Sequence, residues 1–597
     1  MTEINGIISK LRDEIEKTIL EKNIVGLAIS LVDDNSIFWN ECFGYTDLES
    51  KKKVNLDTTF SIQSIGKVFT AVAIMRGVTK GIISLDSKLI NYYPNFTINS
   101  KYGEPQIDKI TIRHLLAHFA GFTHRSKVGG EYDLSEPTFE EYVRSIPDTW
   151  LRYPIGERFL YSNLGMALAA YSLQKASSMS FTEFVQKEIC APIGITALTY
   201  GKKASEKNPN RAIGYHFGRE AEYSNLIFYG AGGQFVSVKD MSRFVQFLLN
   251  EGKINGKSHI KKELLDEMAN EQFNVKESKK YYGLGLYVDK EQFNGIELRH
   301  HSGSGCGFGA FIAWNLDYKV GAIIFSNSDQ AQDVVKIGKE AINSLLILKG
   351  AEIAPPQEIT PSTFITKPRI PVDVNSIKKL EGLYAISGGR FEFKITDNKP
   401  FAIYQGQPIP LHSHSEIEFT ADMPLAIRFI LEEDNPYAAD VLMNGVIHRL
   451  LYHKAKEEEV FGSNKKNWKQ LEGIYQSIYL GDPVYFAIKV DNGHLKVYLE
   501  NKCEILTEYK DNIFFTNDER AVIFQDNFLY FDNIKMNRLE DPVKPLKDFL
   551  AKNPNHRFLS KWKLKELYFN LVYLEKKEEA DEIKEMLFQL YPEEKKH

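Results

Sequence analysis

The spacing of apolar and polar positions changes along the chain, and each change predicts a different element. Residues 1–20 mix acids, lysines and apolar residues at helical spacing, which predicts an amphipathic helix. The run Val68–Met75 is almost wholly apolar and predicts a buried helix, preceded by a short β-type run over Thr58–Ile62. Strands are expected at 26–32, 36–43, 283–288, 296–300, 309–315 and 320–327, before a helix over 331–347.

Strands are thus predicted at both ends of residues 1–350, with a long, mainly helical region between them. Elements of one domain must cover each other's apolar faces, so strands from the two ends should join in one sheet. We therefore predict an α/β domain that combines an antiparallel sheet with an inserted helical lobe.

The second half of the chain carries an internal repeat. Prolines from Pro355 to Pro371 predict an extended linker before it. Leu380-Glu381-Gly382-Leu383-Tyr384 recurs as Leu471-Glu472-Gly473-Ile474-Tyr475, and short alternating segments follow each copy, which predicts two small antiparallel β-barrels. The expected parts are the α/β domain at 1–350, a linker at 351–375, barrels at 376–462 and 463–541, and C-terminal helices at 542–597.

Composition excludes several classes of function. A chain of 597 residues is too long for a single hydrophobic core, and its net charge of -5 argues against general nucleic-acid binding. The longest apolar runs fall short of the ~20 residues that span a bilayer, and the N-terminal segment lacks an export signal. We expect a cytoplasmic protein without membrane partners. The four cysteines have neither disulfide nor metal-ligand spacing; they are Cys42, Cys190, Cys306 and Cys503.

The tetrapeptide Ser64-Ile-Gly-Lys67 is the main candidate for chemistry. A serine hydroxyl is a weak nucleophile unless a base lies beside it, and a spacing of i to i+3 on a helix places Lys67 next to Ser64. Burial in the apolar helix should lower the pKa of Lys67 and leave an amine that can accept a proton. The alternative is a helix cap followed by a solvated lysine. Other Ser-x-x-Lys copies lack the apolar setting; they begin at Ser50, Ser172, Ser258, Ser376, Ser463 and Ser560.

Two later segments complete a known pattern. Tyr161-Ser-Asn163 and His301-Ser-Gly303 follow Ser64-x-x-Lys67 in the order of the β-lactamase and penicillin-binding-protein family, which the chain resembles. Taken alone, Tyr161-Ser-Asn163 would be an ordinary turn before a helix. Four further segments are similar to this family in the expected order, namely Thr111–Phe122, Pro154–Glu157, Ala231–Ser237 and Tyr282–Gly285.

The resemblance implies roles for the first two motifs. Ser64 would be the nucleophile and Lys67 its proton acceptor or electrostatic activator. Tyr161 would share in proton transfer, although a phenol with a pKa of about 10 acts as a base only if that pKa is depressed. Asn163 would hold the Lys67 amine and a substrate carbonyl or amide through its two-sided side chain.

The third motif would line the substrate site with Ser302, Gly303 and Ser304. The oxyanion hole would be formed by the backbone N–H groups of Ser64 and Ser304. His301 stands where penicillin targets carry lysine, so the permanent charge for a substrate carboxylate is lost and recognition is expected to depend on pH. His300 is a competing candidate for this position.

A second histidine pair raises the question of a metal. His114 and His118 have the i, i+4 spacing of zinc ligands, but no glutamate lies between them as in a metalloprotease motif. We therefore expect packing or hydrogen-bonding roles, with no metal and no cofactor.

The two repeats resemble the lipocalin-like barrels that some members of this family carry, notably those of the D-aminopeptidase type. The resemblance therefore implies a serine hydrolase of the D-aminopeptidase or esterase type that acts on a small ester or peptide-like amide. The alternatives are a β-lactamase or D-alanyl-D-alanine carboxypeptidase and, in another class, a non-catalytic ligand-binding protein. A barrel loop could wall the catalytic cleft, or the barrels could serve only stability or assembly. The sequence leaves the oligomeric state open.

Overall fold

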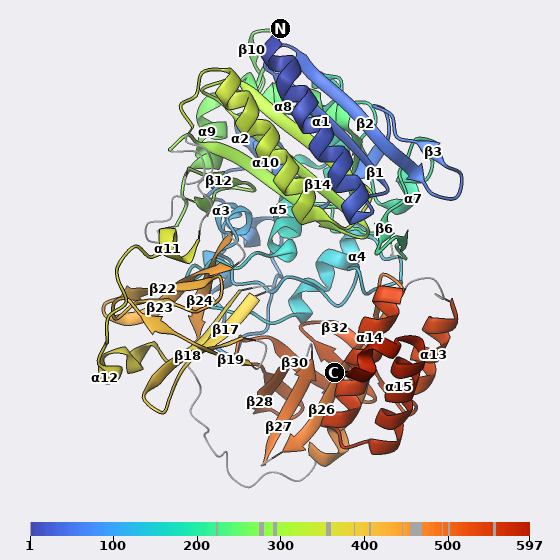
Figure 1. Ribbon diagram of the computed structural model, residues 1–597. Helices are drawn as coiled ribbons and strands as arrows, with labels where there is room; N and C mark the ends of the chain where they lie inside the picture. The colour runs from blue at the N-terminus through green and yellow to red at the C-terminus, as the bar shows by residue number, and fades with distance from the viewer. Residues whose placement is uncertain are drawn as a thin grey trace. The chain divides into compact units, whose positions relative to one another are not determined.

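A computed structural model describes most of the chain (Figure 1). It divides into two compact units, residues 1–354 with 478–482, and residues 355–477 with 483–597. The predicted boundary between the two barrels, at 462–463, and residues 354–359 of the predicted linker lie outside the described residues. The described residues are 2–222, 225–273, 280–290, 295–353, 360–386, 389–404, 407–443, 446–453, 468–491, 493–499, 502–552 and 557–596.

The first unit is built on an eight-stranded sheet in which all pairs are antiparallel. As predicted, strands from both ends of the domain join, because β1 pairs with β15 in the register Ile29↔Ile324. In spatial order the strands are β11 (Lys280–Tyr282), β12 (Tyr287–Asp289), β13 (Leu298–Gly305), β14 (Phe308–Asn315), β15 (Val320–Ser326), β1 (Gly26–Asp33), β2 (Ile37–Asp47) and β3 (Lys52–Lys53).

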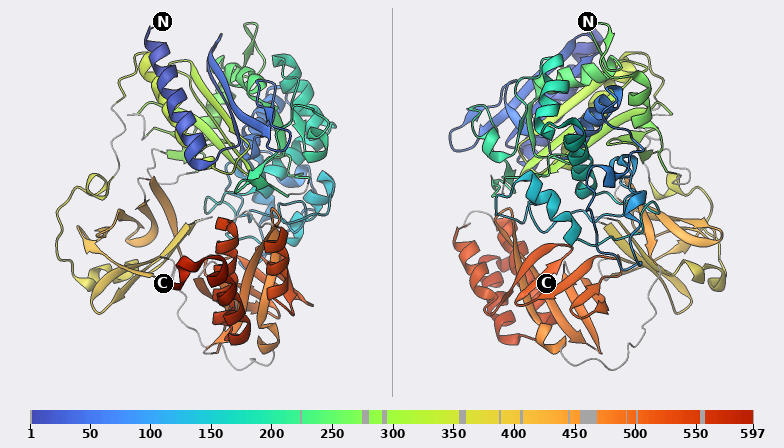
Figure 2. Two further views of the ribbon diagram at one scale, coloured as in Figure 1. Left: turned by 45° about the vertical axis from the view of Figure 1, so that its right-hand side comes forward. Right: turned by 180° about the vertical axis from the view of Figure 1, so that it is seen from behind.

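Alternate residues of the central strands supply two separate cores. Ile29 and Leu31 of β1 pack into a cluster with Leu11 and Ile15 of helix α1 (Thr2–Lys22) and residues of α10 (Ala331–Leu348). Figures 1 and 2 show these two helices side by side on one face of the sheet. Ala28 and other residues of opposite orientation belong to the larger core shared with the helical lobe. Both faces of the sheet are therefore covered.

The helical lobe follows β4 (Thr59–Ser61), which pairs with β8 (Gln234–Ser237), itself paired with β5 (Thr199–Tyr200). Its central element is α2 (Gly66–Thr79), in which most side chains are buried. The other helices are α3 (Ile112–Leu116), α4 (Phe139–Arg144), α5 (Asn163–Ser177), α6 (Phe181–Val185), α7 (Lys202–Ser205), α8 (Val238–Leu249) and α9 (Lys262–Ala269). Two short hairpins are β6 (Tyr215–His216) with β7 (Arg219–Glu220), and β9 (Lys253–Ile254) with β10 (Lys257–Ser258).

The strand expected at 283–288 is wrong in its position. Residues 283–286 form the connection between β11 and β12, and only the last two predicted residues are in a strand. Gly285 has a φ of 78°, which favours glycine, and a Cβ there would lie 2.8 Å from the carbonyl oxygen of Lys67. Gly285 therefore serves a close turn over α2, and Gly283 allows a close approach to Met268 of α9, rather than forming a strand.

The second repeat forms the closed barrel that the sequence predicts. Its strands are β25 (Gly473–Tyr479), β26 (Asp482–Asp491), β27 (His494–Leu499), β28 (Lys502–Lys510), β29 (Ile513–Phe515), β30 (Ala521–Gln525), β31 (Phe528–Phe531) and β32 (Ile534–Leu539).

The first repeat forms a nine-stranded sheet whose two edge strands, β19 and β20, are separated in the chain only by Leu411. The sheet therefore curls most of the way round, but Pro408 and Pro410 deprive β19 of N–H donors at the edge. This differs from the fully closed barrel that the repeat predicts. Its strands are β16 (Gly382–Ile386), β17 (Gly389–Thr396), β18 (Lys399–Tyr404), β19 (Gln407–Pro410), β20 (His412–Ser413), β21 (Glu418–Thr420), β22 (Leu425–Glu432), β23 (Asn435–Met443) and β24 (Val446–His453), preceded by α11 (Pro361–Phe364) and α12 (Val374–Ile377).

Three helices end the chain, α13 (Val543–Lys552), α14 (Arg557–Tyr573) and α15 (Lys577–Leu590). Their apolar faces form a cluster with Ile474 and Tyr485 of the closed barrel. Within the second unit, these helices therefore cover one side of that barrel.

The stacked rings of Phe69 in α2 and Phe244 in α8 provide a test of the first unit's core. Their centroids are 3.9 Å apart at an interplanar angle of 13°, and both side chains are fully buried. We expect Phe69→Ala to lower the free energy of unfolding of this unit by about 3 to 5 kcal/mol, because it leaves a cavity. Leu20→Ala, at a side chain that is 79% exposed, is the control and should change it by less than about 0.5 kcal/mol. Urea unfolding in which the two variants behave alike would contradict the packing.

Candidate active site

Ser64 lies in the tight turn between β4 and α2. Residues Gln63–Ile65 form a 3-10 turn, and Gln63 has a φ of 48°, which is uncommon for a residue with a side chain. The sequence predicts that Ser64 opens the helix, whereas the structure places it one turn earlier. Ser64 is partly exposed, and its neighbours Gln63 and Ile65 are buried.

Lys67 projects from the first turn of α2 into a completely buried position. Its Nζ donates to Ser64 Oγ at 3.2 Å, to Asn163 Oδ1 at 2.8 Å and to the carbonyl oxygen of Ala231 at 3.0 Å. The three acceptors use the full donor capacity of an ammonium group. The amine is thus fixed beside the serine by partners from three separate segments.

The charge state of Lys67 is governed mainly by burial. Burial lowers the pKa of Lys67 well below its ordinary value, and the carboxylate of Glu131 acts in the opposite direction. The side chain therefore loses its proton at a lower pH than a solvated lysine would. A neutral amine 3.2 Å from Ser64 Oγ can receive the proton of the hydroxyl.

Tyr161 and Asn163 flank Ser162, the N-cap of α5. The Ser162 hydroxyl accepts from the N–H of Gly165 and donates to the carbonyl oxygen of Thr123 at 2.6 Å. The turn before a helix and the candidate motif are therefore the same structure, because the cap directs the two neighbouring side chains toward Lys67.

Tyr161 is held neutral by its surroundings. Its ring centre lies 4.6 Å from Lys67 Nζ and 4.5 Å from the ring centre of His118. Burial raises the pKa of Tyr161 well above its ordinary value, although a hydrogen bond with Ser64 opposes the shift. The phenol therefore keeps its proton in the resting site. This favours Lys67 over Tyr161 as the initial acceptor.

His301 lies on β13 with both ring nitrogens engaged. Nδ1 is 2.7 Å from the carbonyl oxygen of Ser302, and Nε2 is 3.3 Å from the hydroxyl of Tyr282. The contacts fit a tautomer in which Nδ1–H donates and Nε2 accepts. His300 instead stacks on Tyr287, with ring centres 5.6 Å apart. Of the two histidines, His301 is the one that hydrogen-bonds Tyr282 beside the candidate motifs.

The expected pH dependence through His301 is not supported. Burial, followed by the nearby Lys67, lowers the pKa of His301 to about 3, with the hydrogen bond to Ser302 opposing it. The imidazole is only 1% exposed and is neutral throughout the neutral pH range. The sequence could not show this, because the burial depends on Tyr282 and other residues that are distant in the chain.

Gly303 explains how the third motif approaches the nucleophile. A Cβ at this position would lie 2.1 Å from the carbonyl oxygen of Ile62, so only glycine allows β13 to pass so close to the turn. Ser302 is partly buried and Ser304 is exposed at the end of β13. The oxyanion hole predicted from the N–H groups of Ser64 and Ser304 stays a prediction.

Sequence analysis did not assign the partners of four residues at this site, although it expected a packing or hydrogen-bonding role for His118. Ala231 supplies a carbonyl acceptor to Lys67, and Tyr282 donates to His301. His118 accepts from the N–H of Ser162 through Nδ1 at 3.2 Å, and His124 contacts Asn163. Three of them lie in segments that resemble the family, but the contacts are tertiary. No spacing rule could have assigned these partners.

The other histidine of the i, i+4 pair has a local role. The side chain of His114 accepts from the N–H of Thr111 and completes the capping box of α3. Among the described residues, no group of three histidine, cysteine, aspartate or glutamate side chains is placed to hold a metal ion. In the same part of the chain, every helix is too short or too polar to cross a membrane.

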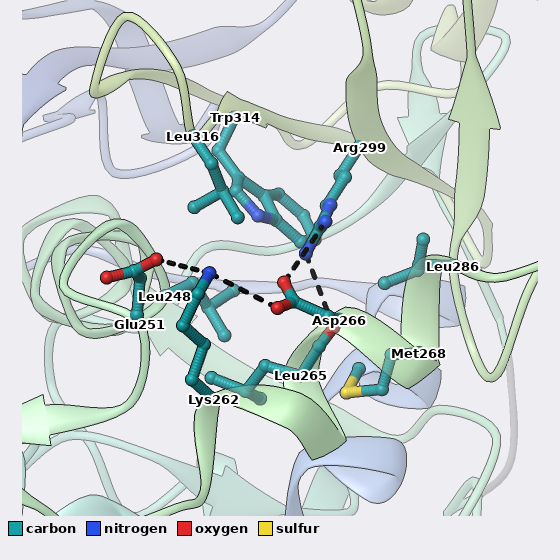
Figure 3. A pocket seen from close by; sticks show the side chains of 10 residues that line it. All are labelled: Leu248, Glu251, Lys262, Leu265, Asp266, Met268, Leu286, Arg299, Trp314 and Leu316. Atoms are coloured by element: carbon teal, nitrogen blue, oxygen red, sulfur yellow. Dashed lines mark hydrogen bonds and ion pairs between the residues drawn. The ribbon is translucent and has the colours of Figure 1, made fainter.

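A small recess elsewhere in the first unit contains none of the candidate residues (Figure 3). Its floor is apolar and includes Leu265 and Trp314, while its rim carries an ion-pair chain from Lys262 through Asp266 to Arg299. The rim charges satisfy one another, so the recess has the features of a structural junction between α9 and the sheet.

Residues 7–346 match the Beta-lactamase family. Protein flp of Staphylococcus aureus (strain COL) is 25% identical over 322 residues, which cover 52% of this chain and 61% of that protein. Penicillin-binding protein 4* of Bacillus subtilis (strain 168) is 23% identical over 461 residues, or 70% of this chain and 95% of that protein.

Solved structures show the same fold. The octameric penicillin-binding protein homologue from Pyrococcus abyssi has a TM-score of 0.51 and 25% identity, and covers 74% of this chain and 99% of its own. SurE, solved with D-Leu, has a TM-score of 0.54 and 16% identity, and covers 76% of this chain and 99% of its own.

The fold is that of the β-lactamase and penicillin-binding-protein family of serine hydrolases. The family match spans more than half of the chain, so the protein belongs to the Beta-lactamase family. The predicted family and fold class are thereby confirmed. The chain aligns with less than two thirds of the Flp protein.

Lys67 provides a test with a defined direction. Because burial lowers its pKa, the neutral amine accumulates as pH rises through the shifted value, and activity should rise with it. Lys67→Arg stays charged and should lose this limb and at least about 100-fold in kcat/KM. Lys80→Arg, on an ion pair with Glu188 beyond the end of α2, is the matched control. Near-normal turnover by Lys67→Arg would refute proton acceptance by Lys67.

We expect the charge of His301 to stay constant in the neutral pH range. The ratio of kcat/KM for a carboxylate-bearing substrate to that for a neutral ester should stay constant from about pH 5.5 to about pH 7.5, because His301 is uncharged throughout. Steady-state kinetics with a cephalosporin and a nitrophenyl ester measure it. A step near the ordinary histidine pKa of about 6.5 that disappears in His301→Asn would overturn the assignment.

Proposed function

We propose that this protein is a serine hydrolase that works through an acyl-enzyme on Ser64, with small esters or peptide-like amides as substrates. The observation that carries the proposal is the buried Lys67 amine 3.2 Å from Ser64 Oγ. A lysine that is merely structural would need neither complete burial nor a partly exposed serine beside it.

The reaction follows from the positions of the protons. As Ser64 Oγ bonds to the substrate carbonyl carbon, its proton passes to Lys67 Nζ and the carbonyl oxygen becomes an oxyanion. Asn163 Oδ1 and the Ala231 carbonyl stabilise the ammonium that forms. The Lys67 ammonium then returns a proton, through the neutral phenol of Tyr161, to the leaving alkoxide or amine as its bond to carbon breaks. In the second step, water attacks the acyl carbonyl carbon and gives a proton to Lys67. A proton then returns to Ser64 Oγ as its bond to the acyl group breaks.

The substrate class follows from His301. A neutral imidazole cannot supply the fixed charge that would hold a carboxylate next to the scissile bond. This supports esters, and peptide-like amides of the D-aminopeptidase type, over carboxylate-bearing β-lactams. The second candidate is a β-lactamase or D-alanyl-D-alanine carboxypeptidase, which the similarity to penicillin-binding protein 4* favours.

An active-site phosphonate tests the nucleophile. We expect intact-protein mass spectrometry to show one addition, and peptide mapping to place it on Ser64, because its partly exposed side chain lies 3.2 Å from the amine of the buried Lys67. Ser64→Ala should abolish labelling. Ser258→Ala removes another Ser-x-x-Lys serine and should leave labelling unchanged.

A substrate panel then decides between the candidates. It contains nitrophenyl esters, D- and L-amino-acid anilides and a chromogenic cephalosporin, all measured as kcat/KM. Faster hydrolysis of the cephalosporin than of every ester and amide would replace the esterase and peptidase proposal by the β-lactamase one. Labelling at Ser302 or Ser304 would refute Ser64 as the nucleophile.

A further inference from the structure

His124 lies in the loop between α3 and α4 and contacts the Tyr161-Ser-Asn163 motif on two sides. Its Nδ1 is 3.3 Å from the carbonyl oxygen of Tyr161, and its Nε2 is 3.2 Å from Asn163 Nδ2. The adjacent Thr123 carbonyl accepts from the Ser162 hydroxyl at 2.6 Å. The loop therefore runs along the motif and bonds to each of its three residues.

The donors and acceptors in this chain admit one consistent arrangement. Lys67 Nζ can only donate when charged, so it requires the oxygen of the Asn163 amide, as observed at 2.8 Å. The amide nitrogen then faces His124 Nε2 and needs an acceptor there. Nδ1 must carry the proton, because its partner is the Tyr161 carbonyl oxygen, which only accepts. Neutral His124 with a proton on Nδ1 satisfies every group.

We propose that His124 is a positioning residue that fixes the orientation of the Asn163 amide, so that the amide oxygen faces the Lys67 amine during catalysis. This rests on the proposed hydrolase function. Without an acceptor at Nε2, the amide is free to turn its nitrogen toward Lys67. The turned amide would offer a donor where the developing ammonium needs an acceptor.

Charged groups around His124 determine where this arrangement holds. Arg125, Glu131 and Lys67 all act on the imidazole, and Arg125 pairs with Glu131 at 3.4 Å. Burial is the largest effect and lowers the pKa of His124 to about 4. Protonation of Nε2 would set two donors against each other, so the arrangement is complete above that pH and is lost as pH falls through it.

Two substitutions of His124 distinguish a role as hydrogen-bond acceptor from a role in packing alone. His124→Leu removes both ring nitrogens and should lower kcat by about tenfold or more, with a smaller change in KM. The reason is that the Asn163 amide can turn away, so the developing Lys67 ammonium loses its hydrogen bond to the amide oxygen. His124→Gln can present an amide oxygen to Asn163 Nδ2 and should recover most of kcat. His114→Gln is the control, because glutamine at this position keeps the capping box of α3.

A double-mutant cycle shows whether the effect passes through Asn163. In the Asn163→Ala background, His124→Leu should cost less than about twofold, since there is no amide left to orient. Equal losses in His124→Leu and His124→Gln, additive losses in the cycle, or full activity in His124→Leu would each overturn the proposal.

Nitrogen-15 NMR of the histidines in the full chain gives a readout that does not require turnover. His124 should show the Nδ1–H tautomer near neutral pH, and an Nε2–H tautomer would overturn the proposal. If wild type neither hydrolyses the panel nor takes up the phosphonate, the proposed function fails, while the NMR result still decides the geometry of His124.

Discussion

The burial of one amine, that of Lys67, is the constraint on which the rest of the site depends. Taking an ammonium out of water is costly, so the protein must either neutralise the group or surround it with acceptors. Here both occur, because burial lowers its pKa while Ser64 Oγ, Asn163 Oδ1 and the Ala231 carbonyl remain within 3.2 Å of the nitrogen. The two effects oppose each other. The amine is therefore able to exist in either protonation state, which is what a group that accepts and returns a proton needs.

The fold brings segments that are far apart in the chain together around the Lys67 amine. Ser64 and Lys67 come from the junction of β4 and α2, Asn163 from the start of α5, and His301 from β13. These elements approach each other closely because glycines stand at two of the contact points. Gly303 lets β13 pass the carbonyl of Ile62, and a Cβ on Gly66 would lie 2.1 Å from the side-chain oxygen of Gln234. The antiparallel pairing of β1 with β15 then joins both ends of the domain around the site.

Sequence patterns predicted the parts of this arrangement that follow from local chemistry. The apolar run after Ser64 predicts a buried helix, and α2 is that helix. The joining of strands from both ends of the domain in one sheet could also be inferred from the sequence, whereas their order could not. What escaped prediction depends on tertiary neighbours. The pKa of His301 falls to about 3 mainly because the folded chain buries it. His124 contacts Asn163 from a loop outside the helices and strands, so its position could not be read from a local pattern. Likewise, the prolines of β19 leave the first repeat open, although its sequence resembles that of the closed second repeat.

The imidazole and phenol side chains around Lys67 share one electrostatic property, which is that burial shifts each toward its neutral form. The pKa values of His118, His124 and His301 are all lowered, and those of Tyr161 and Tyr282 are raised. Such a site offers little to a charged ground state. In the proposed reaction, the dipoles of the site and the Lys67 amine would gain strength only when charge develops on the substrate oxygen and on Lys67 during attack. A substrate without a charged group beside its carbonyl would lose no ionic contact between the ground state and the transition state. This is the physical reason for proposing neutral esters and amides, rather than carboxylate-bearing ligands, as substrates.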